Sequence, residues 1–300
     1  MMVEDFVCNL CGSSNAKVIP FRYSFKERYI DAVKCSMCNL ISLHPQPTAI
    51  EIEEMYREEY FTEADKETHH GTQDYLSLTE NVDYTEKINF VKQYVKSGTI
   101  LEVGCATGTL LKQLQETGFI VKGIEISKFA ADFATKNLGI DVINKAFDNS
   151  LLGNELQENS VDAILMGDVL EHFTNPKEAM ELSLKILKKG GVLIVTVPCT
   201  LNLPSTRIAF LFYRLLGSQK TMTIPPYHLT EFFPKTLKKM FVESGFSKAI
   251  IKQRTKHPKT ITLRHSKVEN LIKLSTQYPN YYLTKLFGIY GDRMTGIGIK

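Results

Sequence analysis

The segments Leu101-Glu-Val-Gly-Cys-Ala-Thr-Gly-Thr-Leu-Leu111 and Gly123-Ile-Glu-Ile-Ser127 decide the fold of this 300-residue chain. They predict an apolar strand, a glycine turn, a helix and a second strand, which is the unit of a parallel sheet. Of the glycines that the dinucleotide fingerprint G-x-G-x-x-G requires, only Gly104 is present. The acid Glu102 stands where a dinucleotide would bring its pyrophosphate to the helix N-terminus. The unit therefore favours a cationic nucleoside cofactor that carries no phosphate.

A second acid, Glu125, ends the second strand, and Gly108 closes the turn. S-adenosylmethionine is a nucleoside cofactor with a sulfonium and an α-amino group, and on these residues the chain resembles the class I S-adenosylmethionine-dependent methyltransferases. The resemblance implies that Glu102 lies near the methionine amino group and that Glu125 accepts both ribose hydroxyls. It also implies that the backbone around the turn and the second strand end contacts the cofactor, namely Gly104, Cys105, Ala106, Gly108 and Ile126. Ala106 departs from the glycine that is frequent there in the family.

The resemblance extends to later strand ends. Phe147 and Asp148, after the third strand, match the position that flanks adenine. Gly167 and Asp168, after the fourth strand, match the segment that passes the methionine end of the cofactor.

Two histidines are candidate bases for a hydroxyl acceptor. His172 lies one turn after the fourth strand, and His228 belongs to Pro226-Tyr-His-Leu-Thr-Glu-Phe-Phe233, which matches a loop that closes over the site in related enzymes. A histidine titrates near neutral pH, so either could take the proton. In the alternative interpretation, His172 only holds the backbone turn and His228 only orients the loop.

Four cysteines have metal-ligand spacing, as Cys8-x-x-Cys11 and Cys35-x-x-Cys38. Two such turns can close a tetrahedral site of four thiolates, which predicts structural zinc with no open position for chemistry. The stretch from Cys8 through the acidic helix at 51–61 resembles the zinc-binding domain that precedes some methyltransferases acting on sugars, polyketides and other small metabolites. Zinc ribbons also occur in methyltransferases of ribosomal RNA, which keeps a nucleic-acid substrate as an alternative.

Strands and helices alternate along the rest of the chain, which predicts a parallel sheet covered on both faces. Strands are expected at 99–103, 120–125, 140–144, 161–166, 191–197, 246–253 and 293–300. The predicted fold class is α/β, a seven-stranded Rossmann-like methyltransferase sheet with helices on both faces, the last two strands forming an antiparallel edge, plus a small N-terminal zinc ribbon.

The predicted domains are a zinc ribbon at 1–47, helices that link it onward at 48–98, and a methyltransferase domain at 99–300. Insertions at about 200–233 and 255–290 follow strand ends, where open α/β sheets bind ligands, so they are expected to shape the acceptor pocket. The apolar helix at the start of the first insertion has another interpretation, contact with a membrane surface or a partner subunit.

Composition and charge set further limits. The chain is 43% hydrophobic and 23% charged and has no run of about eighteen apolar residues, so no transmembrane helix is expected. The start lacks the pattern of a signal peptide, which predicts a cytoplasmic location. The net charge is +3, but the segment from Lys248 to Lys273 alone carries +7. This basic stretch is either a solvated surface or a site for an anionic, phosphate-bearing acceptor.

The sequence therefore predicts a methyltransferase that O-methylates a small molecule such as a sugar, a nucleotide-linked sugar, a polysaccharide precursor or a secondary metabolite. An RNA or protein methyltransferase that docks through the ribbon and the basic insertion is one alternative. A cofactor-binding interaction protein without activity is another. No pattern in the chain indicates an oligomeric state.

Overall fold

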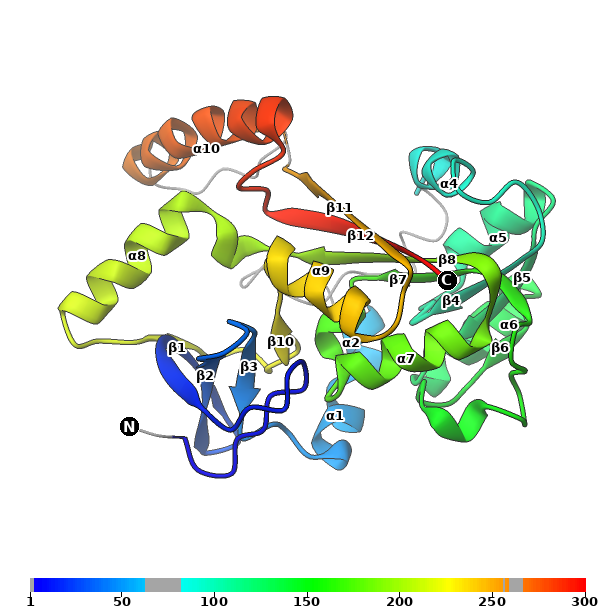
Figure 1. Cartoon of the computed structure of the whole chain (residues 1–300), viewed down its shortest axis with the longest axis horizontal. Helices are drawn as coiled ribbons and strands as arrows, with labels where there is room; N and C mark the ends of the chain where they lie inside the picture. Colours follow the sequence, from blue (N-terminus) through cyan, green and yellow to red (C-terminus); the bar gives the residue numbers. More distant parts are fainter. Residues whose placement is uncertain (1–2, 63–81, 256, 259–266) are drawn as a thin grey trace.

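The computed structural model describes residues 3–62, 82–255, 257–258 and 267–300. The described residues form two sheets, one of seven strands and one of five (Figure 1). The seven-stranded sheet carries the glycine turn, and the five-stranded sheet is built around the N-terminal segment.

The strand order of the larger sheet confirms the predicted fold class. In spatial order its strands are β11 (Lys248–Arg254), β12 (Arg293–Ile299), β8 (Leu187–Pro198), β7 (Val161–Gly167), β4 (Thr99–Val103), β5 (Ile120–Ile124) and β6 (Val142–Ile143). All neighbouring pairs from β8 to β6 are parallel, whereas β12 is antiparallel to both β8 and β11. The chain order reverses direction between β4 and β7, and ligands of open α/β sheets bind at such a point.

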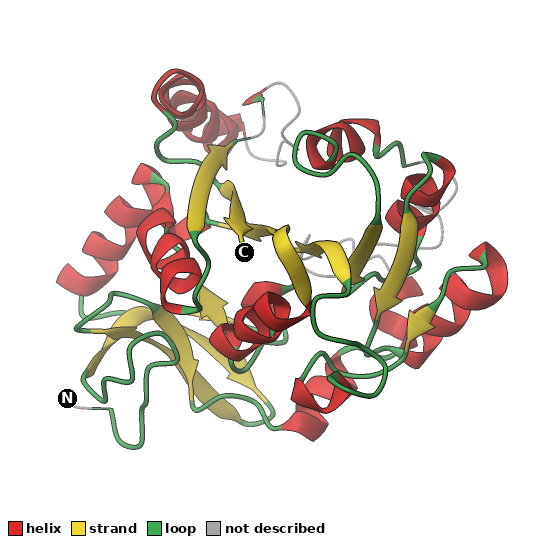
Figure 2. Ribbon diagram, turned by 45° about the vertical axis from the view of Figure 1, so that its right-hand side comes forward, coloured by secondary structure: helices red, strands yellow, loops and turns green. Residues whose placement is uncertain are grey.

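Side chains alternate between the two faces of this sheet. In β4, Ile100 packs with α4 (Thr85–Val91) and α5 (Thr109–Glu116), while Leu101 packs with α7 (Pro176–Ile186) and α9 (Pro234–Glu243). The two-residue repeat of an extended strand requires this alternation. Helices therefore cover both faces, as predicted (Figure 2). α6 (Lys128–Leu138) packs beside α5, with three alanines buried.

The smaller sheet is made from two distant parts of the sequence. In spatial order its strands are β10 (Thr230–Glu231), β3 (Ile41–His44), β2 (Arg28–Cys35), β1 (Ala16–Phe25) and β9 (Lys220–Met222). The first three strands of the chain form the antiparallel centre, and the segment at 200–233 supplies both edges. The first insertion is thus part of the N-terminal sheet as well as a connection after β8.

Two short helices lead from the small sheet back to the large one. α1 (Ala49–Met55) begins with a capping box, in which the side chains of Thr48 and Glu51 each accept a hydrogen bond from the other residue's backbone N–H. Both oxygens of Glu51 also accept hydrogen bonds from Arg28 of β2, each at 2.8 Å. This bidentate pair lowers the pKa of Glu51 to about 2 and fixes α1 to the small sheet. α2 (Glu58–Thr62) follows.

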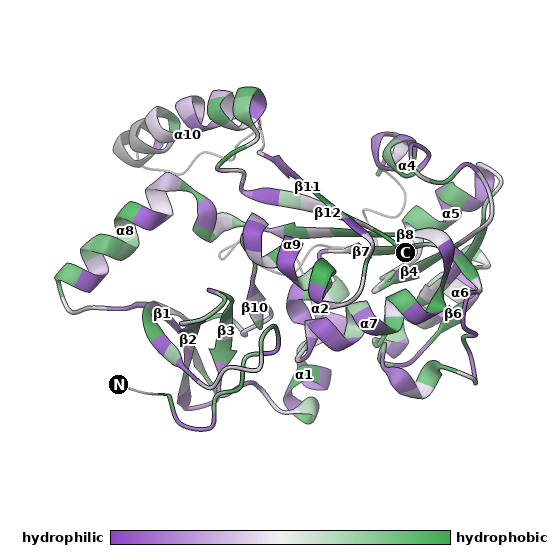
Figure 3. Ribbon diagram, in the orientation of Figure 1, coloured by the Kyte–Doolittle hydropathy of each residue, from purple (hydrophilic) through white to green (hydrophobic). Residues whose placement is uncertain are grey.

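Two further helices leave apolar side chains uncovered. α8 (Pro204–Leu215) has no buried residue, and α10 (Lys267–Phe287) precedes β12 (Figure 3). The exposed apolar side chains of α8 and α10 include Ile208, Leu211, Phe212, Leu215, Tyr282, Leu286 and Phe287. On its other side α8 meets the small sheet, with the rings of Phe210 and Phe21 6.3 Å apart. Among the described residues, no helix combines the length and the apolar character needed to cross a bilayer.

Packing between α9 and β12 gives a test of the core. Phe241 is fully buried, and its ring lies so close to Gly296 and Gly298 that a methyl group on either would come within 2.5 Å of it. We expect Phe241→Ala to lower the free energy of unfolding by about 3–5 kcal/mol, because a large cavity would open between helix and sheet. Val242→Ala, at a neighbouring position that is 56% exposed, should change it by less than about 0.5 kcal/mol. Equal denaturation midpoints for the two variants in urea would contradict this packing.

Candidate functional site

The turn between β4 and α5 passes close to its neighbours at the carboxyl ends of the strands. Gly104 and Gly108 both have positive φ, +68° and +77°. A methyl group on Gly104 would lie 2.5 Å from Cγ2 of Val169, and one on Gly108 would lie 2.9 Å from Cβ of Ala134. Both positions therefore require glycine for conformation and for space. Ala106, at the position where the family often has glycine, also has positive φ, +47°.

Glu102 is a buried acid at the last position but one of β4. Its side chain is 7% exposed, and Oε2 has no hydrogen-bond partner among the described residues. The Lys87 ammonium of α4 lies 3.9 Å from Oε1. Burial raises the pKa of Glu102 to about 7, although the charge of Lys87 opposes the shift. A cation brought to Oε2 would make this carboxylate more favourable in its ionised form.

Glu125 follows β5 and is held differently. Its Oε2 accepts a hydrogen bond from the backbone N–H of Ala106 and its Oε1 one from Ser127, both at 2.9 Å. Burial raises the pKa of Glu125, and these two hydrogen bonds oppose the shift. Each carboxylate oxygen has two lone pairs, so each can still accept a hydroxyl. The role in ribose binding stays a prediction, as does that of Ile126, which is 43% exposed beside it.

The later strand ends lie as follows. Phe147 is buried with its ring edge-on to Phe173, and Oδ1 of Asp148 accepts the N–H of Ser150 at 2.8 Å, which caps the short helix η1 (Asn149–Leu151). Gly167 leaves room for Lys87, whose Nζ would be 3.0 Å from a methyl group there. Asp168 has φ +58° and forms an ion pair with Arg293.

On the other side of Asp168, the structure brings together Glu171, His172 and His228. One donor atom from each lies within 4.8 Å of the others, and Nε2 of His172 is 3.6 Å from Oε1 of Glu171. The two imidazole centroids are 5.1 Å apart. His172 and His228, which are predicted from separate motifs, thus share one site. Its third member is the carboxylate of Glu171, which lies between β7 and β10.

The N-terminal part of the chain and the first insertion position this cluster. The Tyr56 hydroxyl, at the end of α1, is hydrogen-bonded to Nδ1 of His172. The backbone N–H of Leu229 donates to the carbonyl of Glu171 at 2.9 Å, which joins the insertion to the short helix η2 (Leu170–His172). Nδ1 of His228 lies 3.8 Å from Oε1 of Glu231 in β10.

Opposite charges within the cluster shift the pKa values of its members. Burial alone would raise the pKa of Glu171, but the imidazoles of His172 and His228 reverse the shift and hold it below its usual value. Burial alone would lower the pKa of His228, but the carboxylates of Glu231 and Glu171 raise it. The carboxylate of Glu171 and the imidazole of His228 therefore each favour the charged form of the other.

Several residues of the site carry no signal that the sequence analysis used. Lys87, Tyr56 and Arg293 are ordinary helix or strand residues in the sequence, and only the fold brings them to the strand ends. Glu171 lies in the motif after the fourth strand, next to His172, and its near-complete burial singles it out (1% exposed).

The basic stretch is only partly described. Lys252 Nζ and Arg254 Cζ each lie 5.1 Å from the ring centroid of Phe90 in α4. Lys256, Lys259 and Arg264 lie outside the described residues, as do the side chains of Lys267 and Lys273. A phosphate site in the insertion at 255–290 stays a prediction.

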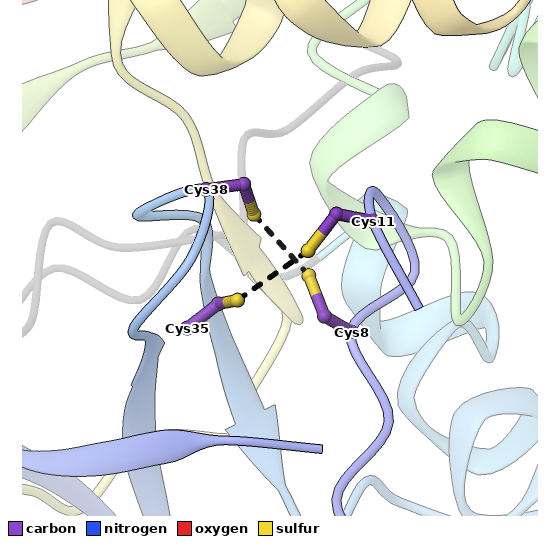
Figure 4. Close-up of side chains that lie close together, drawn as sticks. All are labelled: Cys8, Cys11, Cys35 and Cys38. Carbon is purple, nitrogen blue, oxygen red and sulfur yellow. Dashed lines mark hydrogen bonds between the residues drawn. The ribbon is translucent and has the colours of Figure 1, made fainter. Parts of the chain in front are cut away.

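The four N-terminal cysteines converge from two turns (Figure 4). Sγ of Cys8 lies 3.4 Å from that of Cys38, and Sγ of Cys11 lies 3.6 Å from that of Cys35. Disulfide sulfurs would be about 2.05 Å apart, whereas thiolates around a tetrahedral zinc ion at about 2.3 Å are about 3.8 Å apart. The donor set therefore fits a closed, structural zinc site.

The cysteine site borders the segment that follows β7 of the large sheet. Nδ2 of Asn9, between Cys8 and Cys11, donates to the carbonyl of Thr174 at 2.6 Å, and Nε2 of Gln46 donates to the same carbonyl at 3.3 Å. Thr174 is two residues past His172. A structural change at the cysteine site would therefore reach the segment that carries Glu171 and His172 through these hydrogen bonds.

Comparison with known proteins places the chain among methyltransferases. Residues 77–249, more than half of the chain, match a family model described as a methyltransferase domain. An uncharacterized protein of Methanocaldococcus jannaschii is 33% identical over 116 residues, 38% of this chain and 51% of that protein. A ubiquinone biosynthesis O-methyltransferase of Caulobacter vibrioides is 33% identical over 109 residues, 35% of this chain and 41% of that protein. The chain spans about half or less of the length of these two relatives.

Among solved structures, a complex between the Haloferax volcanii Trm112 methyltransferase activator and a putative methyltransferase contains a chain similar to this one. The TM-score is 0.50 at 15% identity, over 75% of this chain and 91% of that chain. At this identity the likeness shows the fold alone.

The cysteine site predicts that the stability of the N-terminal part depends on a bound metal ion. We expect Cys35→Ser to lose one zinc ion per chain and to lower the thermal midpoint, because a structural zinc site contributes on the order of 10 kcal/mol of apparent folding free energy. Cys199→Ser, at a buried thiol that donates to the carbonyl of Phe232, should keep the zinc. Metal content measured by mass spectrometry and a thermal scan check this. Unchanged zinc content in Cys35→Ser would contradict the assignment.

Proposed function

Because this chain belongs to the methyltransferase domain family, we propose that it transfers the methyl group of S-adenosylmethionine to a hydroxyl oxygen of a small molecule, such as a sugar, a nucleotide-linked sugar, a polysaccharide precursor or a secondary metabolite. The cofactor supplies an electrophilic methyl group on a sulfonium ion. The protein then has two tasks, to hold a cationic donor and to present an acceptor hydroxyl in line with it.

The observation that carries the proposal is the buried carboxylate of Glu102. Its Oε2 has no hydrogen-bond partner among the described residues, and a buried carboxylate oxygen without one is costly unless a cation reaches it. The α-amino group of S-adenosylmethionine is such a cation. Gly104 and Gly108 leave the adjoining turn open to close approach, and Glu125 keeps acceptor capacity for ribose hydroxyls.

Lys87 completes the methionine end of the proposed cofactor site. Its ammonium lies beside both Glu102 and Gly167, so it partly neutralises the buried acid in the absence of a ligand. In the cofactor complex we assign it to the methionine carboxylate, which carries the complementary charge.

The acceptor hydroxyl is assigned to the cluster of Glu171, His172 and His228. Methyl transfer forms an oxygen–carbon bond, breaks the carbon–sulfur bond with its electron pair left on sulfur, and requires that the hydroxyl lose its proton. His172 and His228 are placed to act on that proton, and the side chain of His228 is 38% exposed, so an acceptor can reach it.

Aromatic side chains beside the cluster favour a small acceptor. The rings of Tyr56, Tyr60 and Tyr227 lie 5.1–5.8 Å from one another, and half-buried tyrosines offer both a flat apolar face and a hydroxyl. The similarity to a ubiquinone biosynthesis O-methyltransferase supports oxygen as the accepting atom.

Cofactor binding should depend on pH through Glu102. The cation requires the ionised carboxylate, whose pKa is about 7 in the free protein. Affinity for S-adenosylmethionine should therefore rise as pH increases from 6 to 7.5 and fall by up to about tenfold per unit below 7. Calorimetry at several pH values measures this.

Glu102→Gln is the matched variant for this prediction. It should bind S-adenosylmethionine at least about tenfold more weakly, because a buried charge pair is lost, and its affinity should no longer change in this window. Glu181→Gln, at a side chain on α7 that is 45% exposed, is the control. Wild-type affinity in Glu102→Gln would exclude the assigned role of this acid.

Methyl transfer can be tested without knowing the acceptor. The protein and S-adenosylmethionine with a labelled methyl group are added to an extract, and the extract is fractionated by size. We expect label in the low-molecular-mass fraction, in a form stable to base as an ether is. Label in RNA or protein would instead support the docking alternative and contradict a small acceptor.

The histidines can be compared in the same assay. We expect His172→Ala and His228→Ala each to reduce the rate by about 10²–10⁴-fold at saturating cofactor, with cofactor affinity unchanged. His44→Gln, in β3 and outside the cluster, should keep the wild-type rate. A loss below about tenfold would remove that histidine from the chemistry.

A further inference from the structure

A carboxylate and two imidazoles meet beside the cofactor site without direct hydrogen bonds between them. Glu171 is 1% exposed, and neither of its oxygens has a hydrogen-bond partner among the described residues. We propose that Glu171, His172 and His228 bind a divalent first-row transition-metal ion, at a second metal site distinct from that of the four cysteines.

The spacing suits a shared ion. Ligand atoms around a tetrahedral ion at about 2.1 Å are about 3.4 Å apart, and Nε2 of His172 lies 3.6 Å from Oε1 of Glu171. All three donor atoms fall within 4.8 Å of one another. The separations between the donor atoms would have to shorten by at most about 1.4 Å to reach this spacing.

The outer nitrogen of each imidazole already has a partner. Nδ1 of His172 is hydrogen-bonded to the Tyr56 hydroxyl, and Nδ1 of His228 lies 3.8 Å from the Glu231 carboxylate. Metal-binding histidines typically use one nitrogen for the ion and direct the other to an oxygen, which fixes the ring and its tautomer. Here both rings keep Nε2 for an ion.

The buried carboxylate provides an independent argument. A carboxylate out of contact with water needs hydrogen bonds or a compensating cation. Glu125, at the same edge of the sheet, obtains two backbone N–H groups, whereas Glu171 has none among the described residues. The imidazole of His172, 3.6 Å from Oε1, stabilises its charge without a hydrogen bond, and an ion between Glu171 and the two imidazoles would bind the carboxylate directly.

The donor set indicates the class of ion. Two imidazole nitrogens and one carboxylate oxygen suit Zn²⁺, Fe²⁺ or Co²⁺, and three protein ligands leave at least one position open. The four cysteines instead form a closed thiolate set. The partial exposure of His228 provides a path by which an ion and an acceptor enter.

The role of this ion in methyl transfer rests on the proposed function, whereas the binding of the ion does not. An ion with an open position would hold the acceptor's hydroxyl oxygen and lower its pKa, so that the proton leaves to water before the oxygen attacks the methyl carbon. The acceptor would then be a molecule whose hydroxyl can coordinate a metal. In this metal-dependent form of the reaction, His172 and His228 act as ligands of the ion.

Metal content and Co²⁺ spectroscopy test the site without an activity assay. The full chain as isolated, with its cysteine site filled by zinc, is titrated with Co²⁺ and then dialysed. We expect about one Co²⁺ per chain, with weak visible absorption and without the intense thiolate-to-cobalt charge-transfer band. Glu171→Gln and His172→Ala should each lose this ion and keep the zinc, while Glu181→Gln should behave as wild type.

Three results would overturn the proposal. They are a wild-type chain that takes up no Co²⁺, an added Co²⁺ that shows only the thiolate band, and a folded Glu171→Gln that binds Co²⁺ as wild type does. Circular dichroism of each variant establishes that it is folded, and His228→Ala gives a second variant should Glu171→Gln fail to fold.

The outcomes also separate this inference from the proposed function. S-adenosylmethionine binding and methyl transfer without Co²⁺ uptake would leave the methyltransferase and remove the metal site. Co²⁺ uptake in a chain that binds no S-adenosylmethionine would leave the metal site and remove the methyltransferase.

Discussion

The structure depends on stabilising the buried carboxylates that lie at the carboxyl ends of neighbouring parallel strands. Glu102, Glu125 and Glu171 are each 6% exposed or less, and all three follow or end neighbouring strands. Because each would be costly without a partner, the surrounding elements are arranged to provide one. Glu125 receives two backbone N–H groups, Glu102 has Lys87 of α4, and Glu171 lies between two imidazoles. The oxygens that stay without a hydrogen bond among the described residues, Oε2 of Glu102 and both of Glu171, are therefore where ligands are expected.

The N-terminal unit has a direct part in this arrangement. Its sheet is closed by β9 and β10 from the segment that follows β8, so it holds the insertion that carries His228. Its first helix, capped by Thr48 and tied to Arg28 through Glu51, ends at the Tyr56 hydroxyl that contacts His172. The cysteine turn adds hydrogen bonds to Thr174. A metal in the cysteine site would therefore stabilise the elements that surround His172 and His228.

The parts that could be predicted from the sequence are those whose chemistry lies within a few neighbouring residues. The Glu102 to Gly108 turn, the two Cys-x-x-Cys pairs and the alternation of apolar strands with helices are local patterns, and the seven strands follow from them. The pairing of β9 and β10 with the N-terminal sheet could not be predicted, since strands of two and three residues have no readable periodicity. Lys87 and Arg293 were missed because a basic residue on a helix or at the start of a strand is most often solvated. Only the strand order brings them to Glu102 and Asp168.

The residues assigned to the cofactor and those assigned to the acceptor come from different parts of the chain. Residues assigned to the cofactor lie on β4 and β7 and on the segments that follow β4, β5, β6 and β7, which belong to the shared methyltransferase sheet. Tyr56, His228 and Glu231 come from the N-terminal unit and the insertion, which lie outside that sheet. Asp168, which forms an ion pair with Arg293 of β12, lies in the chain between Gly167, beside Lys87, and Glu171. Changes in the N-terminal unit or the insertion can therefore alter the proposed acceptor site, or its proposed ion, while the carboxylates of Glu102 and Glu125 keep their partners.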